Sequence, residues 1–135
     1  MTLSVPRALV AAAIAVLTST TLAAHHGNAS FDTSKQVTLK GTVTEWIWAN
    51  PHCFLKFDAM DDTGKVRNWA VETQNPTDMT IRGWRRTSFK TGDMVTVILQ
   101  AVKGGAPIGR ILRVVLPSGE TLVASGPQQP PQPPK

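Results

Sequence analysis

The sequence has little of what builds disulfides, and it lacks the common catalytic motifs. Of its 135 residues only Cys53 is a cysteine, so an exported monomer cannot form an internal disulfide. There is no P-loop, dinucleotide-binding glycine motif, Cys-x-x-Cys or Ser/His/Asp arrangement. Cys53 and His52 cannot act as a nucleophile pair, because adjacent residues of a strand point to opposite faces. We therefore expect a protein that is not an enzyme.

Long hydrophobic runs are also missing. The longest, residues 8–17, is shorter than the roughly 20 residues that cross a bilayer. Arg7 precedes this run, and small, mostly polar residues follow it as far as Ala24. This is the pattern of a signal peptide over residues 1–24, cleaved near Ala23 or Ala24. It predicts a periplasmic or secreted protein with no membrane anchor in the mature chain.

An excess of charge of one sign is absent as well. The chain has 14 basic and 9 acidic residues. Loss of Arg7 with the signal peptide leaves a mildly basic mature protein with a net charge of +4. The charges are interspersed, so no polybasic arm or membrane patch stands out. Together with export, this small charge argues against nucleic acid as a partner.

Alternating apolar and polar residues predict a mainly β protein. Asn75-Pro76, followed by Asp78 in the first turn, predicts one short helix as far as about Gly83. The cysteine shares its strand parity with Leu55, which favours a buried, structural thiol over a reactive or metal-binding one. The expected strands cover residues 36–48, 52–60, 66–73, 94–102, 111–116 and 121–123.

The first expected strand contains two irregular features. Gly41 interrupts the alternation, which suggests a bulge or a tight bend. Trp46 and Trp48 have the opposite parity to the aliphatic residues before them. Either the strand bulges or twists there, or the two indoles line an outer surface.

The order of three strands, a short helix and further strands is that of the oligonucleotide/oligosaccharide-binding (OB) fold. We predict a small five- to six-stranded OB-like barrel over residues 36–124, with the helix between strands 3 and 4; an open β-sandwich is the alternative. Residues 25–35 read as an N-terminal arm from which Phe31 can pack against the core. Residues 125–135 read as a disordered tail rich in proline and glutamine.

Several motifs along the mature chain together resemble an uncharacterised exported bacterial family, domain of unknown function family 6152. The resemblance implies export and a small β domain, and it implies no activity. This chain departs from the family pattern at Cys53 and Ser118. The motifs are Ala-His-His from Ala24, Val-Thr-Leu-Lys-Gly-Thr-Val from Val37, Trp-x-x-x-Asn-Pro-His from Trp46, Asn-Trp-Ala-Val-Glu from Asn68, Arg-Gly-Trp from Arg82, Lys-x-Gly-Asp from Lys90 and Leu-Pro-x-Gly from Leu116.

The sharpest chemical feature is the mature N-terminus. Cleavage after Ala23 places His26 third, where a free α-amine, two backbone amides and an imidazole can hold Cu(II) or Ni(II) in a square plane. Cleavage after Ala24 places His25 first, and its amine and imidazole can chelate copper with His26 or His52 as a further ligand. These three histidines are the candidate metal ligands, unless the pair in the arm binds stray metal without purpose.

A second candidate is a pair of His52, at the start of one strand, with Glu72, at the end of another. The carboxylate could orient the imidazole across the sheet. Strand register is not fixed by the sequence, so a structural hydrogen bond that closes the Asn-Pro-His corner is the favoured alternative.

Tryptophans beside arginines offer a third candidate, because OB surfaces hold single strands or sugars by stacking on aromatic rings. Core packing with one exposed indole competes with this interpretation. The candidate face consists of Trp46, Trp48, Asn50, Trp69, Glu72, Trp84 and Arg85. We therefore expect an exported, non-enzymatic binding protein that takes a transition metal, copper, at its N-terminal histidines; the alternative is an OB-type module for a periplasmic protein or an envelope glycan.

Overall fold

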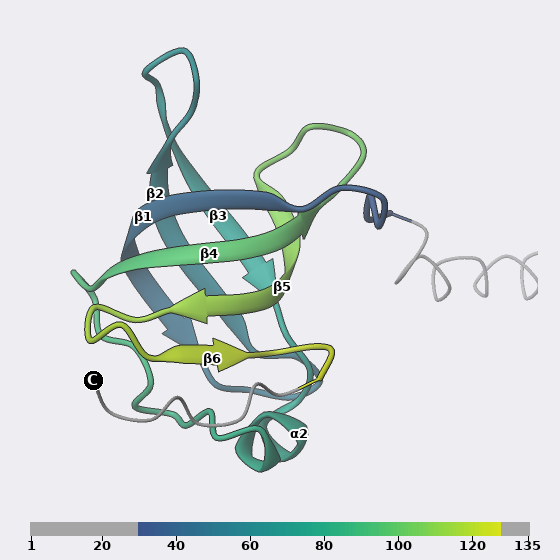
Figure 1. Cartoon of the computed structure of the whole chain (residues 1–135), viewed down its shortest axis with the longest axis vertical. Helices are drawn as coiled ribbons and strands as arrows, with labels where there is room; N and C mark the ends of the chain where they lie inside the picture. Colours follow the sequence, from purple (N-terminus) through teal and green to yellow (C-terminus); the bar gives the residue numbers. More distant parts are fainter. Residues whose placement is uncertain (1–29, 128–135) are drawn as a thin grey trace, which may run out of the picture. The chain divides into compact units, whose positions relative to one another are not determined.

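The computed structural model describes residues 30–127, in which six strands and one short helix form a barrel (Figure 1). The order of strands is β3-β2-β1-β4-β5-β6, and β3 also pairs in parallel with β5. This pairing closes five strands into a barrel, with β6 as an extra strand beside β5. The elements are β1 (Val37–Ile47), β2 (Phe54–Met60), β3 (Val66–Glu72), α2 (Pro76–Ile81), β4 (Met94–Ala101), β5 (Ile108–Val115) and β6 (Thr121–Val123).

The predicted OB-like architecture is confirmed, including the helix between the third and fourth strands. The period-2 pattern also assigns the faces of β2 and β3 correctly. Leu55, Phe57 and Val71 are completely buried, whereas Lys56 and Asn68 between them lie on the outer surface. Alternate side chains of β2 and β3 therefore point into the barrel interior, as in other small barrels.

A β-bulge near Thr44 explains the parity of the tryptophans. Val43 lies opposite Phe57, but Glu45 lies opposite Lys56, so β1 has one extra residue at this point. Beyond the bulge the inward positions change from odd to even numbers. Trp46 consequently packs against the core, and the bulge was the correct one of the two alternatives.

Gly41 has a different role from the bulge. It lies where β1 crosses closely over β2, between its partners Ala59 and Val95. An added Cβ would come within 2.8 Å of the Phe57 ring and even closer to the carbonyl oxygen of Asp58. Only glycine allows this approach, which the strand needs in order to serve both halves of the barrel.

Helix α2 begins as the sequence predicts and ends earlier. The Asn75 side chain accepts a hydrogen bond from the Asp78 N–H at 3.0 Å and donates one to the Asp78 carboxylate at 2.9 Å. Pro76 occupies the first turn. The helix ends at Ile81 because Gly83, with φ +86°, turns the chain into a loop.

The boundaries of two strands were predicted less well. β5 begins at Ile108, three residues before the prediction, because its first residues pair with β3 although Gly109 and Arg110 hide the alternation. Regular pairing in β2 begins at Phe54. Cys53 before it still exchanges backbone hydrogen bonds with the 73–74 segment.

The chain before β1 is fastened to the barrel at Phe31. This residue is buried, forms a bridge with Val102, and has the Arg110 guanidinium 5.1 Å from its ring centroid. The Asp32 N–H donates to the Ala101 carbonyl at 2.8 Å. The predicted signal peptide, residues 25–29 of the predicted arm and residues 128–135 lie outside the described residues. No helix within residues 30–127 is long and apolar enough to cross a membrane.

Candidate functional site

The predicted metal ligands divide between two parts of the chain. His25 and His26 lie outside the described residues, so their prediction stays a prediction. Within residues 30–127, no three histidine, cysteine, aspartate or glutamate side chains lie close enough to hold a metal ion. The barrel described here therefore offers His52 as a single histidine and not as part of a ready ligand set.

His52 closes the corner between β1 and β2. Its ring Nδ1 lies 2.8 Å from the carbonyl oxygen of Thr73. A carbonyl can only accept, so Nδ1 must carry the proton and donate it. In the neutral ring this leaves Nε2 with a free lone pair, which is the tautomer that a metal ligand at Nε2 requires.

The hydrogen bond of His52 is the structural one that competed with the Glu72 pairing. Glu72 lies opposite Phe54 on one side and Arg110 on the other, on the outer surface. The described hydrogen bonds connect the imidazole to the backbone of Thr73 and not to the Glu72 carboxylate. The register that the sequence left open thus places the backbone of Thr73, directly after β3, beside the ring nitrogen, and not the carboxylate of Glu72 at the end of that strand.

Cys53 is a core residue. Its side chain is completely buried, and burial raises the pKa of its thiol by disfavouring the thiolate. Hydrogen bonds from the Ala49 backbone and the Thr73 side chain and the charge of Arg86 oppose this shift, but burial is the largest cause. A protonated, inaccessible thiol is a poor nucleophile and a poor metal ligand.

Three of the four tryptophans form one cluster with Phe89. Trp46 and Trp48 lie at and just after the C-terminal end of β1, which is at the lower end of the barrel in Figure 1. Trp46 lies 5.7 Å from Trp48, 5.9 Å from Trp84 and 4.9 Å from Phe89, measured between ring centroids. Trp84 is completely buried, and its Nε1–H donates to the Val123 carbonyl at 3.1 Å. Trp46 and Trp48 are half-buried against the same core.

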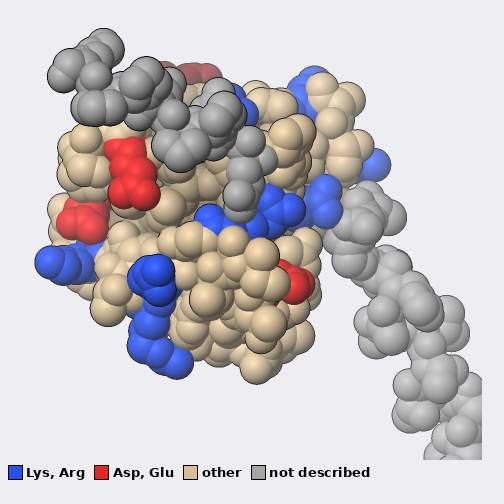
Figure 2. Space-filling model, turned by 60° about the horizontal axis from the view of Figure 1, so that its bottom comes forward, with Lys and Arg blue, Asp and Glu red and all other residues tan. Residues whose placement is uncertain are grey.

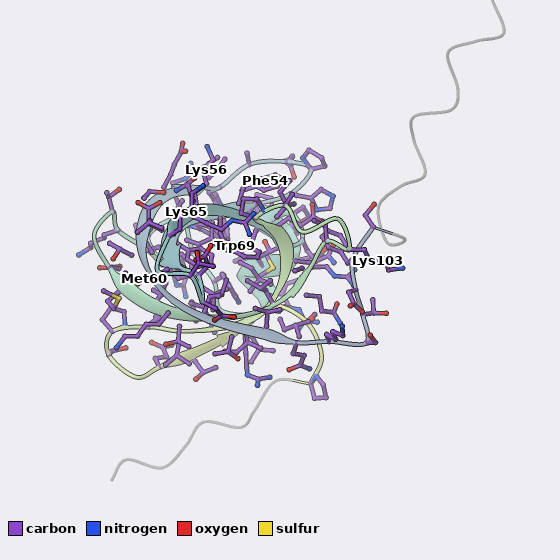
Figure 3. The ribbon with its side chains drawn as sticks, turned by 90° about the horizontal axis from the view of Figure 1, so that it is seen from above. Phe54, Lys56, Met60, Lys65, Trp69 and Lys103 are labelled. Carbon is purple, nitrogen blue, oxygen red and sulfur yellow. The ribbon has the colours of Figure 1, made fainter. Side chains whose placement is uncertain are left out.

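Trp69 lies at the opposite end of the barrel. Figure 3, seen from above, shows its side chain within the ring of strands. The Arg67 guanidinium lies 5.9 Å from the Trp69 ring centroid and donates to the Gly105 carbonyl at 2.9 Å. The predicted stacking face is therefore not one surface, because two of its tryptophans, Trp69 and Trp84, are core residues.

The remaining members of that face differ in exposure. Asn50 is exposed at the corner, next to a cis peptide bond with Pro51. Arg85 is exposed beside the aromatic cluster, and its carbonyl oxygen accepts a hydrogen bond from Trp46 Nε1 at 3.1 Å. Arg67 and Arg86 were predicted to lie near the tryptophans of this face, and Arg82 was not. Arg82 opens the same Arg-Gly-Trp-Arg-Arg run that contains Arg85 and Arg86.

The geometry defines a class of protein: a small OB-like β-barrel with His52 at the corner between β1 and β2 and an aromatic cluster at one end. A comparison with curated proteins found no match. The chain belongs to the family of unknown function DUF6152, whose model matches residues 12–111, about three quarters of the sequence. The family that the motifs resemble is thus confirmed, and its description states no activity.

Proposed function

We propose that this protein is an exported, non-enzymatic copper-binding protein in which the mature N-terminus supplies the primary ligands. The observation that carries this proposal is the Ala24-His25-His26 sequence at the predicted cleavage point. Cleavage on either side of Ala24 leaves a free α-amine within two residues of an imidazole. An amine, backbone amides and imidazole nitrogens are the donors that Cu(II) favours in tetragonal geometry.

The described barrel has three features that support the proposal. It contains no group of three potential metal ligands that would compete for the ion, within residues 30–127. Its one histidine, His52, has the Nδ1-protonated tautomer that leaves Nε2 available. The thiol, which would otherwise be the strongest ligand for Cu(I), is buried inside the core.

Isothermal titration of Cu(II) into the mature protein tests the proposal. The protein is purified from the periplasm, and its first residue is identified by mass spectrometry. We expect one tight equivalent per chain, lost in the double variant His25→Ala, His26→Ala. The matched control His52→Ala is expected to retain it, because that residue belongs to the barrel and not to the primary ligands. Retention of the tight equivalent in the double variant would contradict the proposal.

A second candidate is an OB-type module that binds a periplasmic protein or an envelope glycan. The observation in its favour is the exposed Arg85, whose carbonyl accepts a hydrogen bond from the half-buried Trp46. Trp84 is completely buried, so a ligand at this end can reach Arg85 and the partly exposed Trp46 and Trp48. Trp48→Ala is expected to abolish binding at this aromatic face and to leave the copper titration unchanged. The double variant His25→Ala, His26→Ala is expected to have the reverse effect, and the two opposite losses separate the candidates.

A further inference from the structure

The segment between α2 and β4, at the lower end of the barrel, is rich in positive charge. Between Asp78 and Asp93 the sequence has four basic residues and no acidic one. Arg85 and Arg86 are exposed, and Arg82 is half-exposed at the end of α2. Figure 2 brings this end forward and shows Lys and Arg side chains across the middle of the face, with acidic ones nearer its margins.

The neighbouring carboxylates keep their negative charge, but among residues 30–127 none of them forms a salt bridge with these arginines. The Asp78 carboxylate accepts from the Asn75 side chain, and Asp93 accepts from the Lys90 N–H at 2.9 Å. Glu120 lines a shallow hollow with Arg85, but it forms no salt bridge with it. Among residues 30–127, the two salt bridges within 4.0 Å both involve lysines at other places, Lys35 and Lys56.

The segment that carries the arginines is held rigidly. The Arg85 N–H donates to the Ser88 hydroxyl at 2.8 Å, and its carbonyl accepts from the Ser88 N–H at 3.0 Å and from the Trp46 indole. Trp84 anchors the preceding residue through its bond to Val123. A backbone fixed in this way loses little entropy when its side chains bind a partner.

An exposed apolar side chain lies beside these arginines. Ile81, the last residue of α2, is 77% exposed, the highest value among the exposed large hydrophobic residues of the described part. It lines an open hollow of about 620 Å³ together with Gln74, Asp78, Arg82 and Gly126. The Arg82 guanidinium donates one hydrogen bond to the Gly126 carbonyl at 3.1 Å and keeps its other N–H groups for a ligand. Arginine next to a protruding apolar side chain suits the interface of a membrane, where phosphates meet acyl chains.

We propose that this end of the barrel docks reversibly onto an anionic phospholipid surface. Arg82, Arg85 and Arg86 contact lipid phosphates, for which the planar guanidinium is well suited. Ile81 enters the interfacial region. Three arginines and one isoleucine give weak, salt-sensitive binding, well short of a permanent anchor. The inference does not depend on copper, since none of these residues is a proposed metal ligand.

Vesicle co-sedimentation of the mature protein tests the proposal. The vesicles contain phosphatidylglycerol with phosphatidylcholine, or phosphatidylcholine alone. We expect binding to the anionic vesicles alone, weakened by salt. Arg85→Gln and Arg86→Gln should each lower the partition coefficient about fivefold, because an arginine near such a surface contributes about one kilocalorie per mole. Ile81→Ser should lower it further, even at low salt.

The matched control is Lys65→Gln, an exposed cation in the β2–β3 turn at the opposite end of the barrel (Figure 3). It removes the same charge and should leave the partition coefficient unchanged. Far-UV circular dichroism checks that each variant is folded. Absence of vesicle binding, an equal loss in Lys65→Gln, or binding to soluble heparin without binding to vesicles would each overturn the proposal.

Discussion

Replacement of Trp84 by alanine tests whether the aromatic cluster holds the lower end of the barrel together. The side chain is completely buried, and its ring centroid lies 5.9 Å from that of Trp46 and 5.6 Å from that of Phe89. Truncation of a buried tryptophan to alanine costs about 3–5 kcal/mol in transfer and cavity energy. The Val123 carbonyl also loses its donor, which adds about 1 kcal/mol.

That loss is a large part of the roughly 5–15 kcal/mol that stabilises a typical domain. Urea unfolding followed by far-UV circular dichroism measures it without relying on tryptophan fluorescence. Trp84→Phe keeps much of the packing and removes the hydrogen bond, so we expect it to lose about 1–2 kcal/mol. Met60→Ala, at a residue 64% exposed, is the control and should change stability by less than about 0.5 kcal/mol. A loss below about 1 kcal/mol in Trp84→Ala would refute the reasoning.

Three further predictions concern other parts of the barrel. Gly41→Ala should destabilise the fold by about 1–3 kcal/mol in the same urea assay, because its Cβ would collide with Asp58 and Phe57; unchanged stability would mean that β1 does not bend there. The Cys53 thiol should react with a maleimide at least about a hundredfold more slowly in the folded protein than in urea, because it is buried and its pKa is raised; equal rates would place it at the surface. A hydrogen bond from the Thr63 hydroxyl lowers the pKa of the Asp61 carboxyl below its ordinary value of 3.8. The ionised group therefore stabilises the folded state above that value, and the contribution is lost as pH falls through the lowered pKa. Asp61→Asn should accordingly unfold at lower urea than the natural protein near neutral pH, with the difference shrinking below pH 3.8; a difference that grows in acid would contradict this assignment.

The sequence was sufficient for the order of the elements because the local signals agree with one another. Alternation fixed the faces of β2 and β3, and the Asn75-Pro76 start fixed the position of α2. The change of parity at Trp46 indicated either a bulge or twist in β1 or a pair of indoles on the outer surface, and the sequence did not decide between them. A bulge becomes definite only when the partner strand is known, and here the partner is β2.

The candidate site was harder to predict because it depends on pairing between distant residues. Trp69 shares its strand parity with the apolar Val71, and both are buried. Trp84 lies in a loop, where no alternation indicates that its side chain is buried as well. Its burial requires β6 to supply the Val123 carbonyl from 39 residues away. The partner of His52 likewise depended on the register between β2 and β3. The arginines at positions 82, 85 and 86 are close together in the sequence. Their exposure and the absence of salt bridges to them within residues 30–127 depend on the fold, and so could not be predicted.

The measurement that tests the central claim most directly is electron paramagnetic resonance of one equivalent of Cu(II) bound to the mature protein, with its native first residue confirmed by mass spectrometry. A second sample carries one additional residue before that first one. We predict a tetragonal spectrum with nitrogen hyperfine coupling in the native protein, and its loss or replacement in the extended chain, because the α-amine is a ligand. Identical spectra from the two samples would show that the free N-terminus does not bind the metal and would contradict the proposed function.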